Sequence, residues 1–139
     1  MNVITKFLIF LLAAPALLSQ TLPGGVIRGT VRFEDWTIWG QVTIPRGCYS
    51  LVIEYAHVPV KVTAQSENGK KITLSPLAIF AGTESGDAQV CLSHWRGHWA
   101  IRSIDLPSLG ISLLFMPRNT ALSLPPKCLP ILKESHGPA

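Results

Sequence analysis

The chain of 139 residues has few charges. Only 14% of its residues are Asp, Glu, Lys or Arg, compared with about 25% in an average soluble domain. The formal net charge is +4, and positive and negative residues alternate along the chain. A nucleic-acid-binding surface needs clustered Lys and Arg. The composition therefore argues against nucleic acid as a partner, and Ser, Thr, Gln and aromatic side chains must cover much of the surface.

The sequence also lacks the motifs of common catalytic and cofactor sites. It has no Gly-rich phosphate loop and no H-E-x-x-H zinc motif. Ser85, in the segment Gly82-Thr83-Glu84-Ser85-Gly86, does not have the G-x-S-x-G spacing of a nucleophile elbow. Glu34 and Asp35 are adjacent, so in an extended chain their side chains point apart and cannot act as an acid–base pair. This pair is better explained as a solvated turn. We expect neither enzymatic activity nor a cofactor.

The one long apolar run lies at the N-terminus. Lys6 precedes the apolar residues 7–14, and small residues follow, including Ala14-Pro15-Ala16. This is the layout of a secretory signal peptide, and the run is shorter than the ~20 residues of a membrane span. We expect a signal peptide over residues 1–20, cleaved within 16–21, and an exported protein in the periplasm, the ER lumen or outside the cell. An uncleaved N-terminal anchor is the alternative.

After the leader, no segment has helical periodicity, and short apolar–polar alternations separated by turn residues predict strands. These segments are 27–33, 36–44, 49–55, 60–65, 71–74, 88–104 and 111–116. The wholly apolar run 77–81 predicts a central strand. We predict an all-β fold, a small single-domain antiparallel β-sandwich of about eight to ten strands over residues 21–124, with Ig-like or transthyretin-like architecture. The Pro-rich residues 125–139 are expected to form an extended or disordered tail.

Two hairpins are predicted in the first half of the chain. The segments 27–33 and 36–44 are expected to pair across Glu34-Asp35, which places Trp36 on the core face and Trp39 on the polar face. In the second hairpin, a three-residue loop at Glu67-Asn68-Gly69 would place Ala64 opposite Ile72 and Val62 opposite Leu74. Because register follows the buried face, we predict this loop, with Gly69 in the left-handed conformation.

Residues 44–54 contain a turn followed by a strand. Pro45 and Gly47 suit the second and fourth positions of a type I turn, and Tyr49 and Leu51 then share one face. This P-x-G-x-Y-x-L pattern resembles the start of a strand in transthyretin-like and carboxypeptidase-regulatory-like sandwich modules. The resemblance covers these eleven residues and implies a sandwich fold.

The segment 88–104 holds two of the four tryptophans and two of the four histidines. It is predicted to form a β-hairpin with a two-residue loop at Arg96-Gly97. Side chains of paired residues lie on the same face of the hairpin. The predicted pairs are Trp95–His98, His94–Trp99, Ser93–Ala100, Leu92–Ile101, Cys91–Arg102 and Val90–Ser103.

Three cysteines follow the leader: Cys48, Cys91 and Cys128. An exported chain meets oxidising conditions, so at least one disulfide is expected. The pairings 48–91, 48–128 and 91–128 are all compatible with the sequence. The odd thiol would be either buried and inert or bridged to another chain in a disulfide-linked dimer.

The tryptophans point to a binding function. Trp36 and Trp99 are expected in the core, and Trp39 and Trp95 on polar faces. Exposed tryptophan beside polar groups is typical of surfaces that bind protein or sugar. We therefore predict a non-enzymatic binding or assembly module with a protein or glycan partner. Its predicted contact residues are Trp39, Trp95, Arg96 and His98, with Arg28 and Arg32 at the margin.

Copper or zinc binding is the second hypothesis. Cys91, His94 and His98 have metal-ligand side chains, and such sites need three or four ligands on the same side. The predicted hairpin, however, places the two histidines on opposite faces, and a disulfide-bonded Cys91 would supply no thiolate. The binding module is therefore the leading hypothesis.

Overall fold

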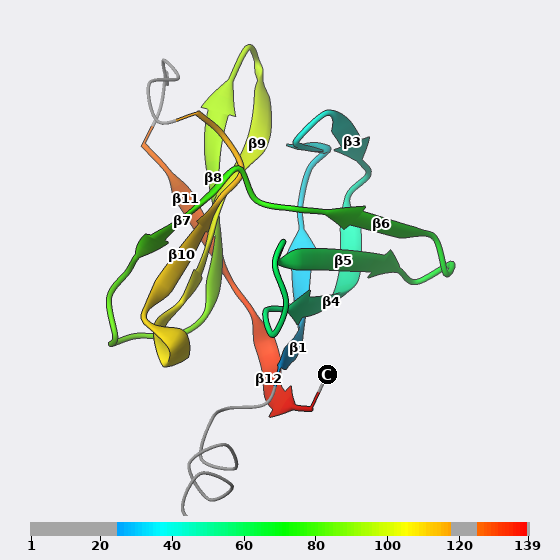
Figure 1. Ribbon diagram of the computed structural model, residues 1–139. Helices are drawn as coiled ribbons and strands as arrows, with labels where there is room; N and C mark the ends of the chain where they lie inside the picture. The colour runs from blue at the N-terminus through cyan, green and yellow to red at the C-terminus, as the bar shows by residue number, and fades with distance from the viewer. Residues whose placement is uncertain (1–24, 118–124, 139) are drawn as a thin grey trace, which may run out of the picture.

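A computed structural model describes residues 25–117 and 125–138 (Figure 1). The signal peptide expected over residues 1–20 lies outside these residues. The described part of the chain contains twelve strands and one short 3₁₀ helix, η1 (Pro107–Leu109). The strands are β1 (Val26–Phe33), β2 (Thr37–Trp39), β3 (Val42–Ile44), β4 (Gly47–Glu54), β5 (Lys61–Ser66), β6 (Lys71–Leu74), β7 (Ala78–Ala81), β8 (Gln89–Trp95), β9 (His98–Leu106), β10 (Ile111–Leu114), β11 (Lys127–Pro130) and β12 (Leu132–Gly137).

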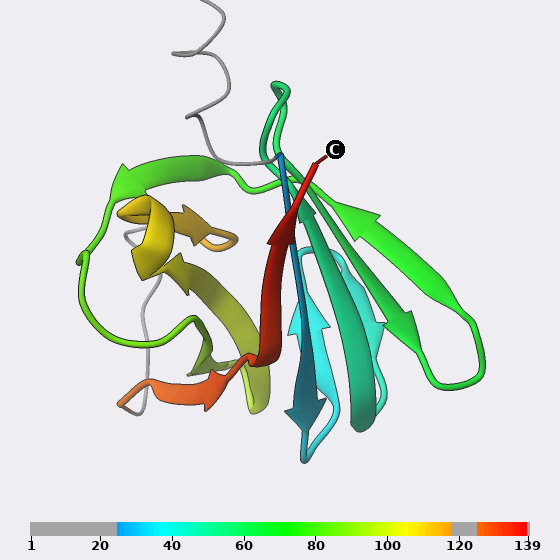
Figure 2. The same ribbon diagram turned by 90° about the horizontal axis from the view of Figure 1, so that it is seen from below.

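The strands form two sheets that pack face to face, which confirms the all-β, sandwich-like fold (Figures 1 and 2). The first sheet has the order β12-β1-β4-β5-β6. The second has the order β11-β8-β9-β10-β7, and β2 joins it in parallel to the first residues of β9, with β3 beside β2. There are more strands than the eight to ten predicted because two segments, 36–44 and 127–137, each form two strands.

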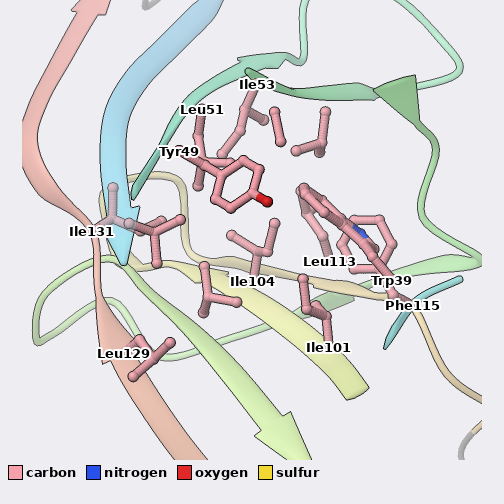
Figure 3. Packing of buried hydrophobic residues seen from close by; sticks show 14 of the residues in the cluster. Trp39, Tyr49, Leu51, Ile53, Ile101, Ile104, Leu113, Phe115, Leu129 and Ile131 are labelled. Atoms are coloured by element: carbon pink, nitrogen blue, oxygen red, sulfur yellow. The ribbon is translucent and has the colours of Figure 1, made fainter. Parts of the chain in front are cut away.

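The core lies between the two sheets. Tyr49, Leu51 and Ile53 of β4 alternate with exposed or half-buried residues and point inward toward Ile104 of β9 and Leu113 of β10 (Figure 3). Burying such side chains stabilises a fold by about 1.5–3 kcal/mol each. The largest fully buried side chains are Trp39, Phe33, Ile27, Ile44, Leu51, Ile53, Ile101, Ile104, Leu106, Leu113, Val31 and Val62.

The β5–β6 hairpin has the predicted register. Ala64 pairs with Ile72, and Val62 pairs with Leu74. The intervening loop has three residues, and Gly69 has a φ of +89°, which costs glycine little because it has no Cβ. The buried face therefore decided this register, as expected.

The predicted pairing of 27–33 with 36–44 is wrong. Strand β1 pairs with β4 and β12, and the 36–44 segment turns back on itself at Gly40, whose φ is +64°. Residues 36–39 still alternate between faces, but β2 pairs with β9 of the second sheet, and the face that carries Trp39 is the one that is buried. Trp39 is therefore fully buried, with its ring 5.6 Å edge-on from that of Phe115, whereas Trp36 leaves 58% of its surface exposed.

The β8–β9 hairpin has the predicted register from Leu92–Ile101 to its tip, and then departs from it. Beyond Leu92, Cys91 pairs with Ser103 and Val90 with Ile104, because an irregularity adds one residue to β9. Ile101 and Ile104 are both fully buried, although residues three apart on a regular strand face opposite sides. The bulge turns both isoleucines into the core.

Strand β7 is an edge strand, which corrects the prediction of a central one. Within residues 25–117 and 125–138, β10 is its one partner strand. Leu77 just before it is 65% exposed, and Ile79 within it is 48% exposed. Apolar composition predicted burial of the strand but could not indicate how many neighbours it would have.

Residues 127–137, expected within a tail, belong to both sheets. Strand β11 pairs with β8, and β12 pairs with β1, so the chain crosses from one sheet to the other at the buried Ile131 (Figure 2). Cys128 forms a disulfide with Cys91 directly across the strands. Among the described residues, no helix is long and apolar enough to span a membrane.

Candidate functional site

The loop of the β8–β9 hairpin projects from one end of the second sheet (Figure 1). Its two residues, Arg96 and Gly97, have φ values of +51° and +80°. Positive φ at both central positions is the geometry of a type I′ turn, whose twist matches that of the flanking strands. The tight turn therefore fixes the positions of the side chains on either side of it.

Trp95 and His98 pair across the strands next to this turn. The Arg96 guanidinium carbon lies 4.6 Å from the centre of the Trp95 ring, a cation–π contact. Trp95 is half-buried, and Arg96 and His98 are exposed. Part of the indole and the two nitrogen-bearing side chains therefore face solvent together.

Trp36 reaches the same end of the sheet from a different part of the chain. Thr37 of β2 pairs in parallel with Trp99 of β9, so Trp36, one residue earlier, lies at the level of His98. We call Trp36, Trp95, Arg96 and His98 the aromatic tip. Sequence reasoning missed Trp36 because it paired residues 36–44 with 27–33 and so assigned the face of Trp36 to the core, whereas β2 pairs with β9.

A second set of contacts holds the base of the hairpin. The rings of His94 and Trp99 meet edge to face, with centres 5.2 Å apart. The Lys127 ammonium lies 5.8 Å from the Trp99 ring and 3.1 Å from a carboxylate oxygen of Glu34. This ion pair is largely exposed, so it contributes about 0–1 kcal/mol, and its main effect is to neutralise Lys127 beside the tip.

Three of the predicted contact residues fall outside the aromatic tip. Trp39 is buried in the core, so its assignment to the binding surface is wrong. Arg28 and Arg32 are exposed on β1 in the other sheet, so they are not part of the tip. The remaining three, Trp95, Arg96 and His98, do lie together.

The proposed set of metal ligands is not available. The Cys91 sulfur is bonded to Cys128. His94 pairs with Trp99 and His98 pairs with Trp95, so the two histidines lie on opposite faces of the hairpin. Among the described residues there is no group of three or more His, Cys, Asp or Glu side chains placed to hold a metal ion. Cys91 has no free thiolate, so the proposed site of Cys91, His94 and His98 lacks one of its three ligands.

Cys48 is the odd cysteine, and it is exposed on β4. Of the two alternatives for the odd thiol, the buried one is therefore wrong, and a bridge to another chain stays a prediction. It lies beside a cavity of about 280 Å³, whose lining includes Arg46, Tyr49 and Lys70. The Tyr49 hydroxyl donates a 2.6 Å hydrogen bond to the Pro45 carbonyl, and burial raises the pKa of Tyr49. This tyrosine is therefore held neutral and acts as a structural donor.

The aromatic tip is the surface where exposed aromatic and basic side chains gather. Comparisons of the chain with protein-family models, with curated proteins and with solved structures found no match. Within the aromatic tip, Trp36 is the exposed large apolar side chain, at 58%.

Proposed function

We propose that the protein is an exported, non-enzymatic binding module that contacts its partner through the aromatic tip. The observation that carries the proposal is the 58% exposure of Trp36. Three residues later, Trp39 is completely buried, so the fold can bury a tryptophan in this segment. Trp36 instead lies at the level of His98, at the end of the sheet where Trp95 and Arg96 also lie.

The size of the exposed indole makes it a strong contact residue. A tryptophan side chain can bury about 150–250 Å², and burial contributes about 25 cal/mol per Å². Covering the exposed part of Trp36 in a complex would therefore contribute about 2–3 kcal/mol, or roughly a hundredfold in affinity. Tryptophan and arginine are also the residues most enriched among those that dominate binding energies.

The shape of the tip favours a protein partner over a glycan. Small ligands are usually bound in concave sites, whereas this hairpin projects from the end of the sheet (Figure 1). A projecting aromatic residue can instead enter a pocket on a protein surface. A glycan that stacks on the two indoles is the second candidate.

Export is supported by two features of different origin. The first 20 residues have the layout of a signal peptide. The Cys91–Cys128 disulfide belongs to an oxidising compartment, because the cytosol of most organisms keeps thiols reduced.

Site-specific photo-cross-linking in cells that export the full chain tests the proposal. A photoreactive side chain at position 36 or 95 should form a covalent adduct with the partner, and one at the exposed Ser50 on the other sheet should not. Trp36→Ala and Trp95→Ala should each weaken binding by about 30-fold without altering the fold. A glycan partner would appear instead as tip-dependent binding on a glycan array.

The same cells provide the controls. Equal labelling at positions 36, 95 and 50, or unchanged binding by both alanine variants, would contradict the aromatic tip as the contact surface. The exported product should begin within residues 16–21 by mass spectrometry. A full-length chain retained inside the cell would overturn the export part of the proposal.

A further inference from the structure

We infer that the free edge of β7 pairs antiparallel with β7 of a second copy, so that two sandwiches share one continuous sheet. Among the described residues, strand β7 ends the second sheet, and β10 is its one partner strand. Its outer edge therefore offers backbone N–H and C=O groups to another strand. The partner that best fits this edge is the same strand, for reasons of charge, hydrogen bonding and side-chain size.

The edge is unprotected in comparison with the other edges of the sandwich. Proteins protect edge strands with charged residues, with proline or by keeping the strands short. Residues 77–82 contain neither charge nor proline. Three other edge strands contain charged residues or proline: Lys71 in β6, Lys127 and Pro130 in β11, and Lys133 and Glu134 in β12. Strand β3 has three residues and is followed by Pro45, and β7 has four residues.

The backbone of β7 presents its outward groups at Ile79. The Gly82 N–H donates to the Gly110 carbonyl at 2.9 Å, and Phe80 lies opposite Ser112 of β10. Along an antiparallel pair, the backbone N–H and C=O groups of successive residues point alternately toward and away from the partner strand. The backbone groups of Ala78, Phe80 and Gly82 therefore point toward β10. Ile79 and Ala81 therefore point their N–H and C=O groups away from the sheet.

A two-fold axis at Ile79 satisfies these groups. Ile79 then exchanges two hydrogen bonds with Ile79 of the second copy, as a directly opposed pair does. In this register Leu77 lies opposite Ala81 of the other copy, and Phe80 lies opposite Ala78. Each larger side chain thus meets an alanine, and Ile79 alone meets itself.

The exposed side chains agree with this arrangement. Leu77 and Ile79 are 65% and 48% exposed. The Leu77 N–H donates to the Leu114 carbonyl of β10 at 2.7 Å, so the outward N–H groups of this edge begin at Ile79. Pairing would cover part of both side chains. An isologous contact of this kind closes at two copies, and the neutral strand places no like charges opposite each other.

Charge substitution at the axis tests the inference. Sedimentation velocity on the mature chain, with Cys48→Ser to exclude disulfide dimers, should show a dimer. Ile79→Lys places two lysines opposite each other and should raise the dimer dissociation constant more than about tenfold. Mixing Ile79→Lys with Ile79→Glu should restore a heterodimer, because the opposed charges then attract.

Two further variants make the outcome decisive. Val42→Lys alters another exposed apolar residue, 37% exposed on the edge strand β3, and should leave the dimer intact. Ala81→Lys places a charge against Leu77 of the other copy and should weaken the dimer even if Ile79→Lys folds poorly. A chain that is monomeric at about 100 μM overturns the inference, as does a dimer unaffected by either β7 variant. A mixture of the Lys and Glu variants that stays monomeric also overturns it.

Discussion

The two sides of the sandwich end in different ways. On one side the chain itself closes the structure: β11 pairs with β8, β12 pairs with β1, and the Cys91–Cys128 disulfide ties β11 to the sheet. We call this the closed side. On the other side, β7 ends the second sheet as far as the described residues go, and Leu77 and Ile79 beside this edge are exposed apolar residues.

The difference shows that one side of a fold can be held by contacts within the chain while a strand edge on the other side can pair with a second molecule. On the closed side, the disulfide and the chain crossing between the sheets are internal contacts, so changes there should lower the stability of the monomer. Strands β11 and β12 are edge strands as well, and Leu132 in β12 is 55% exposed. At β7 the outward backbone groups have no partner strand within the described part of the chain. Changes there should alter association while leaving monomer stability nearly constant.

The largest expected effect is loss of the disulfide on the closed side. Cys91 and Cys128 are separated by 37 residues, and a loop of that length predicts about 4 kcal/mol of stabilisation from the cross-link. The double variant Cys91→Ala/Cys128→Ala should lower the free energy of unfolding in urea by about this amount. Cys48→Ser, at the exposed free cysteine, is the matched control. Equal urea midpoints for the double variant and the wild type would show that the closed side does not depend on the bridge.

A smaller effect is expected at Gly29, where β1 lies close to the crossing chain. A Cβ at this position would overlap Ile131 Cγ2 and lie 3.2 Å from the Leu132 carbonyl oxygen. Gly29→Ala should therefore destabilise the fold by about 1–3 kcal/mol, the usual cost of overpacking. Gly137→Ala, on the paired strand β12, would meet only the Arg28 side chain at 3.9 Å and should change stability little. Similar melting temperatures for the two variants would contradict close packing at the crossing.

The smallest effect concerns Tyr49, which lies in the core and belongs to neither side. Tyr49→Phe removes the hydrogen bond to the Pro45 carbonyl and should cost about 1 kcal/mol at neutral pH. Burial raises the pKa of Tyr49 in the folded protein, so above the ordinary tyrosine pKa of about 10 the folded state binds more protons than the unfolded state. Stability should therefore fall as the pH rises past that value, and the fall should be smaller in the Phe variant. Urea titrations at increasing alkaline pH measure both effects, and parallel curves for the two proteins would rule out this linkage.

The sequence by itself determined the features that depend on local chemistry and on one buried face. Alternation predicted the inward side chains Tyr49, Leu51 and Ile53 of β4. Turn residues and the buried face together predicted the β5–β6 register and the Arg96-Gly97 turn. These features could be derived because the residues that decide them are neighbours in the chain or across a single hairpin.

The tertiary structure decided which strands are neighbours, and with it most of the candidate site. Nothing local to residues 27–33 indicates that they pair with β4 and β12, because pairing between distant segments depends on the burial of both sheets together. The same is true of β7, whose apolar run suits an edge or a centre equally well. Trp36 and Trp39 exchanged their expected places because β2 pairs with β9 and not with β1, and β9 lies some 60 residues away in sequence. The sequence specifies the chemistry of each side chain, but the exposure of Trp36, Trp39 and Ile79 depends on which distant segments pack against them.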